Sequence, residues 1–353
     1  MGGRPRILIP GGSGVFGRHL ARELLATTSA HVVLAGRDLR RAEAAMRDLG
    51  EPARTEAVSL DLADAEAFEL AARGCFAVAC TAGPFQGLPD GLPLSAVRAG
   101  AHWLDIGDDP GWVLRLIDDG ALGGEAAKAG LAVMPGLSAV PAVSGVLARW
   151  CRARLPDGDT ARVTLFIGNR NEKGTGATAS ALIGGFRDPI WVELPFGRRK
   201  AHRFPTPDAE LFRRELGVSA EFRVALEWAY LGRLTAALGR LTSRSGPGGQ
   251  TDLARRLSWL SRPFDRLGSD LGCVQVELWK GGGPAIAAAA VAGQCLVVLP
   301  CALALQALLE GRAISPGVAH PAGWTDPDAY LSGLMSRGVR ILTRSRAPVD
   351  GDD

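Results

Sequence analysis

The stretch that decides the fold is Arg6-Ile-Leu-Ile-Pro10 followed by Gly11-Gly12-Ser13-Gly14-Val15-Phe16-Gly17. A short apolar strand leads into a glycine-rich turn, and a helical pattern with Leu20 and Leu24 on one face comes next. In this setting GxGxxG glycines allow a tight turn, admit a pyrophosphate and let the helix pack close to the strand, while the helix N-terminus offers N–H groups to phosphate. The stretch predicts a dinucleotide-binding turn; a glycine turn without a nucleotide is the alternative.

The second apolar run, 31–35, ends in Gly36-Arg37-Asp38. An NAD enzyme usually has a carboxylate here, which binds the ribose 2′-OH. A guanidinium would instead pair with a 2′-phosphate. The pattern therefore favours NADP over NAD. The alternative is that Arg37 faces solvent and Asp38 caps the helix expected over 39–49.

Strand and helix patterns alternate six times up to residue 134, with strands expected over 6–10, 31–35, 57–60, 76–80, 102–106 and 131–134. The helix patterns between the later strands cover 63–73, 92–100 and 111–130. This alternation predicts an α/β fold, a Rossmann-type doubly wound parallel sheet. Ligands of such sheets bind at the carboxyl ends of the strands. The candidate cofactor-binding residues are therefore Gly11, Gly12, Ser13, Gly14, Val15, Phe16, Gly17, Arg37, Asp61, Leu62, Thr81, Ala82, Gly83, Pro84 and Phe85.

Beyond residue 137 the pattern changes to a mixed α+β module. We expect helices over 140–155, 177–183 and 207–240, a strand over 162–167, a polar loop over 169–176 and a linker at 243–249. A strand-like stretch over 191–203 contains a basic turn at 198–200, and 272–279 pairs with 285–292. The predicted domains are 1–137 (NAD(P)-binding), 138–298 (α+β, substrate or oligomerisation), 299–343 (C-terminal helices packing back on the first domain) and 344–353 (disordered tail).

Composition excludes several classes of protein. A net charge of +3 is too small to indicate a nucleic-acid partner. Six cysteines without a CxxC pair fit reduced thiols in a cytoplasmic protein, and five histidines without ligand spacing predict no metal. The uncharged stretch 284–309 is long enough to span a bilayer, but its glycine, glutamine and proline favour a strand followed by a buried helix. The early glycine turn leaves no room for a signal peptide, and a homodimer is left open.

Five motifs together resemble the saccharopine dehydrogenase-like NAD(P)-binding oxidoreductases: the glycine turn 11–17, Ala35-Gly36-Arg37, Thr81-Ala82-Gly83-Pro84-Phe85, Ala101-His102-Trp103-Leu104-Asp105 and the segment 135–141. The resemblance covers the first domain, whereas the second follows the family only in layout. It implies a nicotinamide cofactor, with the turn 82–85 close to its ribose and ring. Segments after the fifth strand and around Ser138 would line the substrate side.

Hydride transfer from a nicotinamide requires placement of the substrate and a proton source. Asp105, His102 and Lys173 are the candidate catalytic residues, and Ser138, Arg170 and Thr175 are the candidate substrate-binding residues. A spacing of three puts His102 and Asp105 on opposite faces of a strand, so they do not form an obvious dyad. The alternatives are an aspartate that caps a loop, a packed histidine and a solvated loop around Lys173.

The reaction remains open at this level, because the resemblance includes enzymes of C–N chemistry and trans-acting enoyl reductases of lipid synthesis. We expect an NADP-dependent oxidoreductase that transfers hydride to a C=N or C=O bond of a small, anionic substrate. One alternative is an enoyl (C=C) reductase of lipid or polyketide synthesis, with 284–309 helping to form an apolar cleft. The other is a non-catalytic NAD(P)-binding sensor or scaffold.

Overall fold

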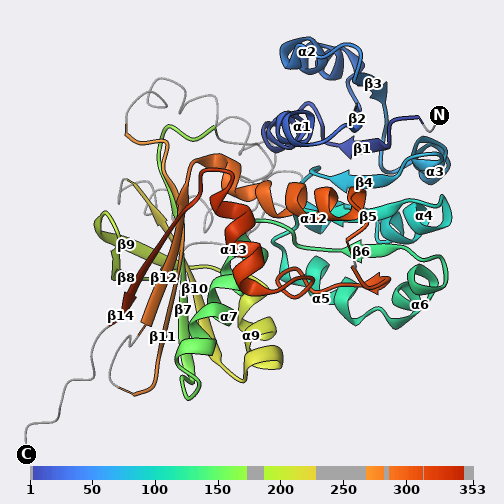
Figure 1. The fold of residues 1–353 in the computed structure, drawn as a ribbon. Coiled ribbons are helices and arrows are strands. Elements are labelled where there is room, and N and C mark those ends of the chain that lie inside the picture. The colour runs from blue at the N-terminus through green and yellow to red at the C-terminus, as the bar shows by residue number, and fades with distance from the viewer. Residues whose placement is uncertain (1–2, 173–186, 228–267, 282–285, 313, 346–353) are drawn as a thin grey trace, which may run out of the picture. The chain divides into compact units, whose positions relative to one another are not determined.

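The computed structural model describes residues 3–172, 187–227, 268–281, 286–312 and 314–345. The chain divides into two compact units, whose elements are shown in Figure 1. Unit 1 comprises Met1–Ala139 and Val297–Thr325, and unit 2 comprises Val140–Leu296 and Asp326–Asp353. Each unit is therefore built from two separate stretches of the chain.

Unit 1 is built on a seven-stranded sheet in the order β13-β6-β5-β4-β1-β2-β3, with every neighbouring pair parallel. The strand order reverses at β1, so the crevice between the loops after β1 and β4 is the expected ligand site of this topology. The predicted α/β doubly wound sheet is confirmed. Its strands are β1 (Arg6–Pro10), β2 (His31–Gly36), β3 (Thr55–Ser59), β4 (Ala77–Cys80), β5 (His102–Asp105), β6 (Ala132–Met134) and an additional short strand, β13 (Gly317–Val318).

Helices cover both faces of this sheet (Figure 1). The helices α1 (Val15–Thr27), α2 (Leu39–Leu49) and α12 (Leu299–Leu309) form one group, and α3 (Ala65–Ala72), α4 (Leu92–Arg98) and α6 (Gly120–Lys128) form the other. Buried residues of α12, among them Cys301 and Leu305, share one apolar core with Leu20 and Leu24 of α1. The C-terminal part of the chain thus completes the core of unit 1.

Aspartate side chains define where several of these helices begin. Asp38, Asp64, Asp109 and Asp119 each accept a backbone N–H in the first turn of the helix that follows, as N-cap residues do. The cap at Asp119 divides the single helix predicted over 111–130 into α5 (Pro110–Asp118) and α6.

Unit 2 has a second seven-stranded sheet in the order β14-β12-β11-β7-β10-β9-β8, in which only β7 and β10 run parallel. The helices α7 (Ser144–Arg154), α9 (Asp208–Leu216) and α13 (Pro327–Met335) belong to this unit, and α7 packs on the strands β11 and β12 as well as on the two other helices. The strands are β7 (Thr160–Ile167), β8 (Arg187–Leu194), β9 (Gly197–Arg203), β10 (Ser219–Leu226), β11 (Gly272–Trp279), β12 (Ile286–Ala292) and β14 (Arg340–Ser345).

Several sequence-based expectations for unit 2 differ from the structure. The segment 219–226 was expected to be helical but forms β10, because it pairs along its full length with β7. Residues 198–200 lie within β9 rather than in a turn. The helix expected from Val140 begins as a π-helical turn over Ala139–Val143, in which Val140 has extended backbone angles, and becomes α-helical at Ser144. The helix expected over 177–183, the linker 243–249 and the tail residues 346–353 lie outside the described residues.

The sequence predicts that the whole segment 299–343 packs on the first domain. In the structure, this segment is divided between the two units. Helix α12 and β13 belong to unit 1, but α13 and β14 belong to unit 2. The reason is that α13 packs on α7 and buries Tyr330, Leu331 and Leu334, while β14 pairs with β12. Arg344 and Ser345, expected in the tail, are the last residues of this strand.

The described part of the apolar stretch 284–309 forms β12, a short 3-10 helix over Gln294–Val297, and α12. Strand β12 belongs to unit 2 and helix α12 to unit 1, and both are largely buried. None of the helices in the described ranges combines the length and the apolar character that a membrane crossing requires.

Candidate functional site

The glycine turn after β1 is tight enough to require glycine at three positions, Gly11, Gly12 and Gly17; a Cβ on Gly12 would lie 2.8 Å from the Cα of Leu34. Gly11 has φ +79°, and a Cβ there would lie 2.7 Å from the backbone nitrogen of Ala82. A Cβ on Gly17 would lie 2.4 Å from the carbonyl oxygen of Gly11. All three distances are shorter than any real contact, so side chains at these positions would force the backbone apart. The turn after β1 and the loop after β4 are therefore in direct contact.

The N-terminus of α1, which follows the glycine turn, has no side-chain cap. Gly14 is its N-cap and provides no side chain to accept from the first turn, which also contains no acidic residue. A Cβ on Gly14 would meet only the carbonyl oxygen of Gly11, at 3.0 Å. An anion can approach such a helix end and interact with its N–H groups and dipole. These residues fit a phosphate group.

The carboxyl end of β2 offers a cationic side chain in an open setting. Arg37 is exposed and, within the described ranges, makes no hydrogen bond or ion pair. Gly36 lies beside Ser13, since a Cβ on Gly36 would be 3.7 Å from the Ser13 hydroxyl oxygen. Asp38 is occupied as the cap of α2, where its carboxylate accepts from the backbone nitrogen of Arg41 at 3.2 Å. The exposed Arg37 is therefore available to an anion at the end of β2.

Arg18 is a residue that the sequence analysis missed. Its Nη1 donates to the carbonyl oxygen of Ser13 at 3.2 Å, and the contact is partly buried. The side chain therefore places a positive charge directly beside the glycine turn. The sequence signal that could have identified Arg18 was its position immediately after Gly17, in the first turn of the helix that follows the glycines.

Most other predicted cofactor-binding side chains stabilise their own loops. Asp61 accepts from the backbone nitrogen of Ala63 at 3.0 Å, and Leu62 packs against the core. The hydroxyl of Thr81 donates to the carbonyl oxygen of Pro10 at 2.9 Å, which links the ends of β4 and β1. These contacts fix the shape of the strand ends.

Asp105, at the end of β5, is fully buried and holds four N–H donors. Its Oδ1 accepts from the backbone nitrogens of Gly107 and Gly136, each at 2.9 Å. Its Oδ2 accepts from the indole nitrogens of Trp103 at 2.9 Å and Trp112 at 3.0 Å. The pKa of Asp105 is raised, because the effect of burial exceeds that of the four N–H donors, each of which lowers it. All its acceptor positions face N–H groups, so Asp105 is not arranged to donate a proton.

His102 begins β5, so it lies at the opposite edge of the sheet from Asp105 and the glycine turn. Its Nδ1 accepts from the backbone nitrogen of Ala132 at 2.9 Å, and burial lowers its pKa. The imidazole is therefore a packed, neutral group within the sheet. His102 and Asp105 have separate partners, and neither geometry supports a catalytic role.

The predicted substrate-binding residues are distributed over both units. Ser138 is buried after β6, and its backbone nitrogen donates to the carbonyl oxygen of Gly136 at 2.8 Å. In unit 2, the half-exposed Arg170 guanidinium lies 3.5 Å from the Asp270 carboxylate. Lys173 and Thr175 lie outside the described residues. Within the described ranges, no group of three or more His, Cys, Asp or Glu side chains is arranged to hold a metal.

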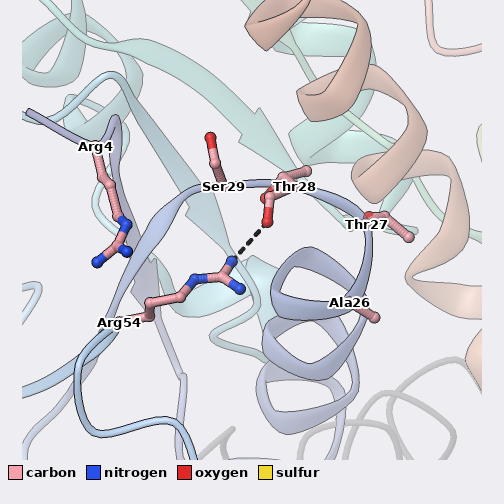
Figure 2. A pocket seen from close by; sticks show the side chains of 6 residues that line it. All are labelled: Arg4, Ala26, Thr27, Thr28, Ser29 and Arg54. Carbon is pink, nitrogen blue, oxygen red and sulfur yellow. Dashed lines mark hydrogen bonds between the residues drawn. The ribbon is translucent and has the colours of Figure 1, made fainter. Parts of the chain in front are cut away.

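A hollow in unit 1 lies away from this edge of the sheet. Figure 2 shows its lining residues: Arg4, Ala26, Thr27, Thr28, Ser29 and Arg54. They precede β1, β2 and β3 in the chain, so the hollow lies at the amino ends of parallel strands. The glycine turn and Arg37 follow the carboxyl ends. The hollow is therefore separate from the candidate cofactor site.

Comparison with known proteins supports this interpretation of unit 1. Residues 11–101 match a protein-family model described as NAD(P)H-binding. The chain resembles the apo form of saccharopine dehydrogenase (L-Glu forming) from Saccharomyces cerevisiae, with a TM-score of 0.67, 15% identity and coverage of 97% of this chain and 100% of that chain. No curated protein sequence matches the chain.

Two further solved structures are more distant. GenD2 from gentamicin A biosynthesis, in complex with NAD, matches with a TM-score of 0.45, 13% identity and 98% of each chain. A short-chain oxidoreductase from Pseudomonas aeruginosa PAO1 matches with a TM-score of 0.30, 20% identity, 37% of this chain and 68% of that chain. Neither is similar enough to carry an argument. From the family match and the yeast structure, we conclude that the chain has an NAD(P)H-binding domain within a saccharopine dehydrogenase-like fold.

Proposed function

We propose that this protein is an NADP-dependent oxidoreductase that transfers hydride to a C=N or C=O bond of a small metabolite. The observation that carries the choice of NADP is the exposed Arg37 at the end of β2, directly after Gly36, which itself lies beside the Ser13 hydroxyl. A carboxylate at this strand end would repel a 2′-phosphate, whereas a guanidinium and a hydroxyl both donate hydrogen bonds to it.

The cofactor would lie across the crevice between β1 and β4. In this proposal the first turn of α1 holds the pyrophosphate, Arg18 adds positive charge there, and the turn 82–85 borders the nicotinamide. When bound, the nicotinamide supplies the hydride, so the protein contributes placement and electrostatics. A saccharopine dehydrogenase-like fold supports the oxidoreductase class.

The substrate would be an anionic compound recognised by cationic and hydroxyl groups. Arg170 is half exposed and only loosely paired with Asp270, so its guanidinium can exchange that partner for a substrate carboxylate. Ser138 and, beyond the described ranges, Lys173 and Thr175 are the further proposed contacts. The apolar stretch 284–309 gives less support to an enoyl reductase, because its described residues pack in β12 and α12.

The decisive test of the cofactor assignment compares Arg37→Ala with Arg47→Ala. Both residues are exposed arginines, but Arg37 lies between β2 and α2, whereas Arg47 lies in the last turn of α2. We expect Arg37→Ala to weaken NADPH binding about tenfold to a hundredfold, the range for a lost hydrogen bond between charged groups, and to leave NADH binding nearly unchanged. Arg47→Ala should change neither. Fluorescence titration at one salt concentration measures both, and equal losses for the two cofactors would contradict the assignment.

The same purified protein distinguishes the reaction classes. Loss of NADPH absorbance with imines or ketones supports the proposed reductase. Turnover of enoyl thioesters alone would replace it with a C=C reductase. Tight NADPH binding without turnover of any of these classes would favour a sensor or scaffold.

A further inference from the structure

We propose that Asp105 is a positioning residue of the cofactor site. Its carboxylate holds the Trp112 indole against Phe85 and thereby fixes the turn 82–85. This inference rests on the proposed function, since it takes the crevice between β1 and β4 as the nicotinamide site. It assigns Asp105 a role without proton transfer.

The Asp105 carboxylate joins three parts of unit 1 at the carboxyl edge of the sheet. Gly107 belongs to the loop after β5, Gly136 to the loop after β6, and Trp112 to α5. The backbone carbonyl of Asp105 also accepts from the nitrogen of Leu137 at 2.7 Å. A carboxylate accepts at about four positions, and all are used. A shift of any one loop would leave a buried donor unpaired, which is unfavourable.

A continuous set of contacts leads from this carboxylate to the glycine turn. A Cβ on Gly107 would lie 2.9 Å from Trp112 Cδ1, 3.0 Å from Asp105 Oδ1 and 3.3 Å from Phe85 Cδ1. These three side chains therefore converge on one backbone position. The Phe85 and Trp112 rings also pack with centroids 5.7 Å apart.

Phe85 ends the turn that begins at Ala82, and Ala82 touches Gly11 of the glycine turn. The path from Asp105 through Trp112 and Phe85 thus reaches the loop that contacts the glycine turn. Because the indole nitrogen of Trp112 is bound to Asp105, the rotation of its ring is fixed. The position of Phe85 follows from the orientation of that ring.

The chain contains a matched control for this role. Asp109 also binds Trp112, but its carboxylate accepts from the backbone nitrogen at 2.8 Å and caps α5. Asp105 therefore orients the ring of Trp112, whereas Asp109 supports its backbone. An asparagine at position 105 would direct an NH2 group at two N–H donors, because an amide accepts only through its oxygen. The same change at position 109 keeps the accepting oxygen, and asparagine is itself a good N-cap.

The test measures the binding of NADPH, NADH and adenosine 2′,5′-bisphosphate to the wild type, Asp105→Asn, Trp112→Phe and Asp109→Asn. The bisphosphate contains the adenosine half of NADPH and lacks the nicotinamide. We expect Asp105→Asn and Trp112→Phe each to weaken both dinucleotides about tenfold, the lower range for loss of a hydrogen bond to a charged group, and to leave the bisphosphate unchanged. Asp109→Asn should leave all three affinities unchanged.

Trp112→Phe keeps a ring against Phe85 and three of the four donors to Asp105, so it gives an answer even if Asp105→Asn does not fold. Equal weakening of NADPH and the bisphosphate in Trp112→Phe would overturn the positioning role and indicate general loss of structure. Unchanged binding of all three ligands in that variant would overturn it as well. If the wild type binds none of the ligands, the proposed function itself fails, and this outcome is distinct from the other two.

Discussion

Gly14 and Gly17 lie in the same turn but have different surroundings. A Cβ on Gly17 would lie 2.4 Å from the Gly11 carbonyl oxygen and 2.6 Å from the Gly12 Cα, so it would strike backbone on both sides. A Cβ on Gly14 would meet only the Gly11 oxygen, at 3.0 Å, and its backbone angles suit any residue. At the scale of single residues, Gly17 is therefore required by the fold, whereas Gly14 is required only by the pyrophosphate contact that we propose.

Substitution at these two positions should separate stability from binding. We expect Gly17→Ala to destabilise the protein by about 1–3 kcal/mol, as overpacking does, because backbone atoms must move. Gly14→Val should destabilise the protein less than Gly17→Ala, because a Cβ on Gly14 meets only the Gly11 oxygen, at 3.0 Å. It should prevent binding of NADPH and NADH, because its side chain fills the approach to the first turn of α1. Thermal melting and cofactor titration measure the two effects. Retained binding in Gly14→Val would refute the assignment of the pyrophosphate to this turn.

The residues of the glycine turn could be predicted from the sequence because their chemistry is local. Strand, glycines and helix follow one another within the stretch 6–27, and the turn geometry requires those residue types. The role of Asp105 could not be predicted in this way. Two of its donors, Trp112 and Gly136, are 7 and 31 residues away along the chain. Only the fold brings these donors to one carboxylate. Sequence spacing could not show them, and it therefore indicated a catalytic candidate instead.

At the scale of elements, β10 was expected to lie among helices. The alternation of Phe222, Val224 and Leu226 with Glu221 and Arg223 is nevertheless typical of a strand. The segment Ser219–Leu226 forms a strand because eight consecutive residues pair in parallel with β7, and β9 pairs with it on the other side. Intrinsic preferences are weak compared with such tertiary contacts. The two-residue strand β13 was not predicted from the sequence. It too is defined by pairing with a distant segment, and its only described partner strand is β6.

Another element-scale feature is the C-terminus of α1, which has no basic residue in its own last turn. Arg54, just before β3, supplies the missing charge: it donates to the carbonyl oxygens of Leu25 at 2.9 Å and Thr28 at 2.6 Å. Figure 2 shows the Arg54 guanidinium directed at Thr28. Cations stabilise this end of a helix, so Arg54 anchors α1 from outside the helix.

We therefore expect Arg54→Met to lower the free energy of unfolding by about 1–3 kcal/mol, because the carbonyl oxygens lose their donor. NADPH affinity should not change, since Arg54 lies at the amino ends of the strands. Arg4→Met is the matched control in the same hollow, as Arg4 makes one exposed contact of 3.3 Å to the carbonyl oxygen of Ala53. Urea denaturation measures the stability of both variants. Comparable losses for Arg4→Met and Arg54→Met would argue against the helix anchor.

At the scale of the whole molecule, unit 1, which contains the region 11–101 matched by the NAD(P)H-binding family model, is discontinuous in sequence. Residues 1–139 contain the glycine turn and six of the seven strands, but α12 and β13 come from 297–325. Val298, Cys301 and Leu305 are fully buried in the same core as Leu20 and Leu24. A chain that ended at residue 139 would expose that apolar surface to water, which removes a main contribution to stability.

We expect residues 1–139 expressed alone to lack a cooperative thermal transition and to bind a hydrophobic dye, as a loosely packed chain does. Joining 1–139 to 297–325 through a flexible linker of about 16 residues, with a mean span of about 20–24 Å, should restore cooperative melting and NADPH binding. The control replaces Leu305 with Asp in the joined chain, which places a charge in the apolar core and should abolish both properties. Cooperative melting of 1–139 alone would show that α12 only covers a core that the first segment completes by itself. If 1–139 alone does not melt cooperatively and the joined chain does, unit 1 forms only when the distant segment 297–325 packs with it.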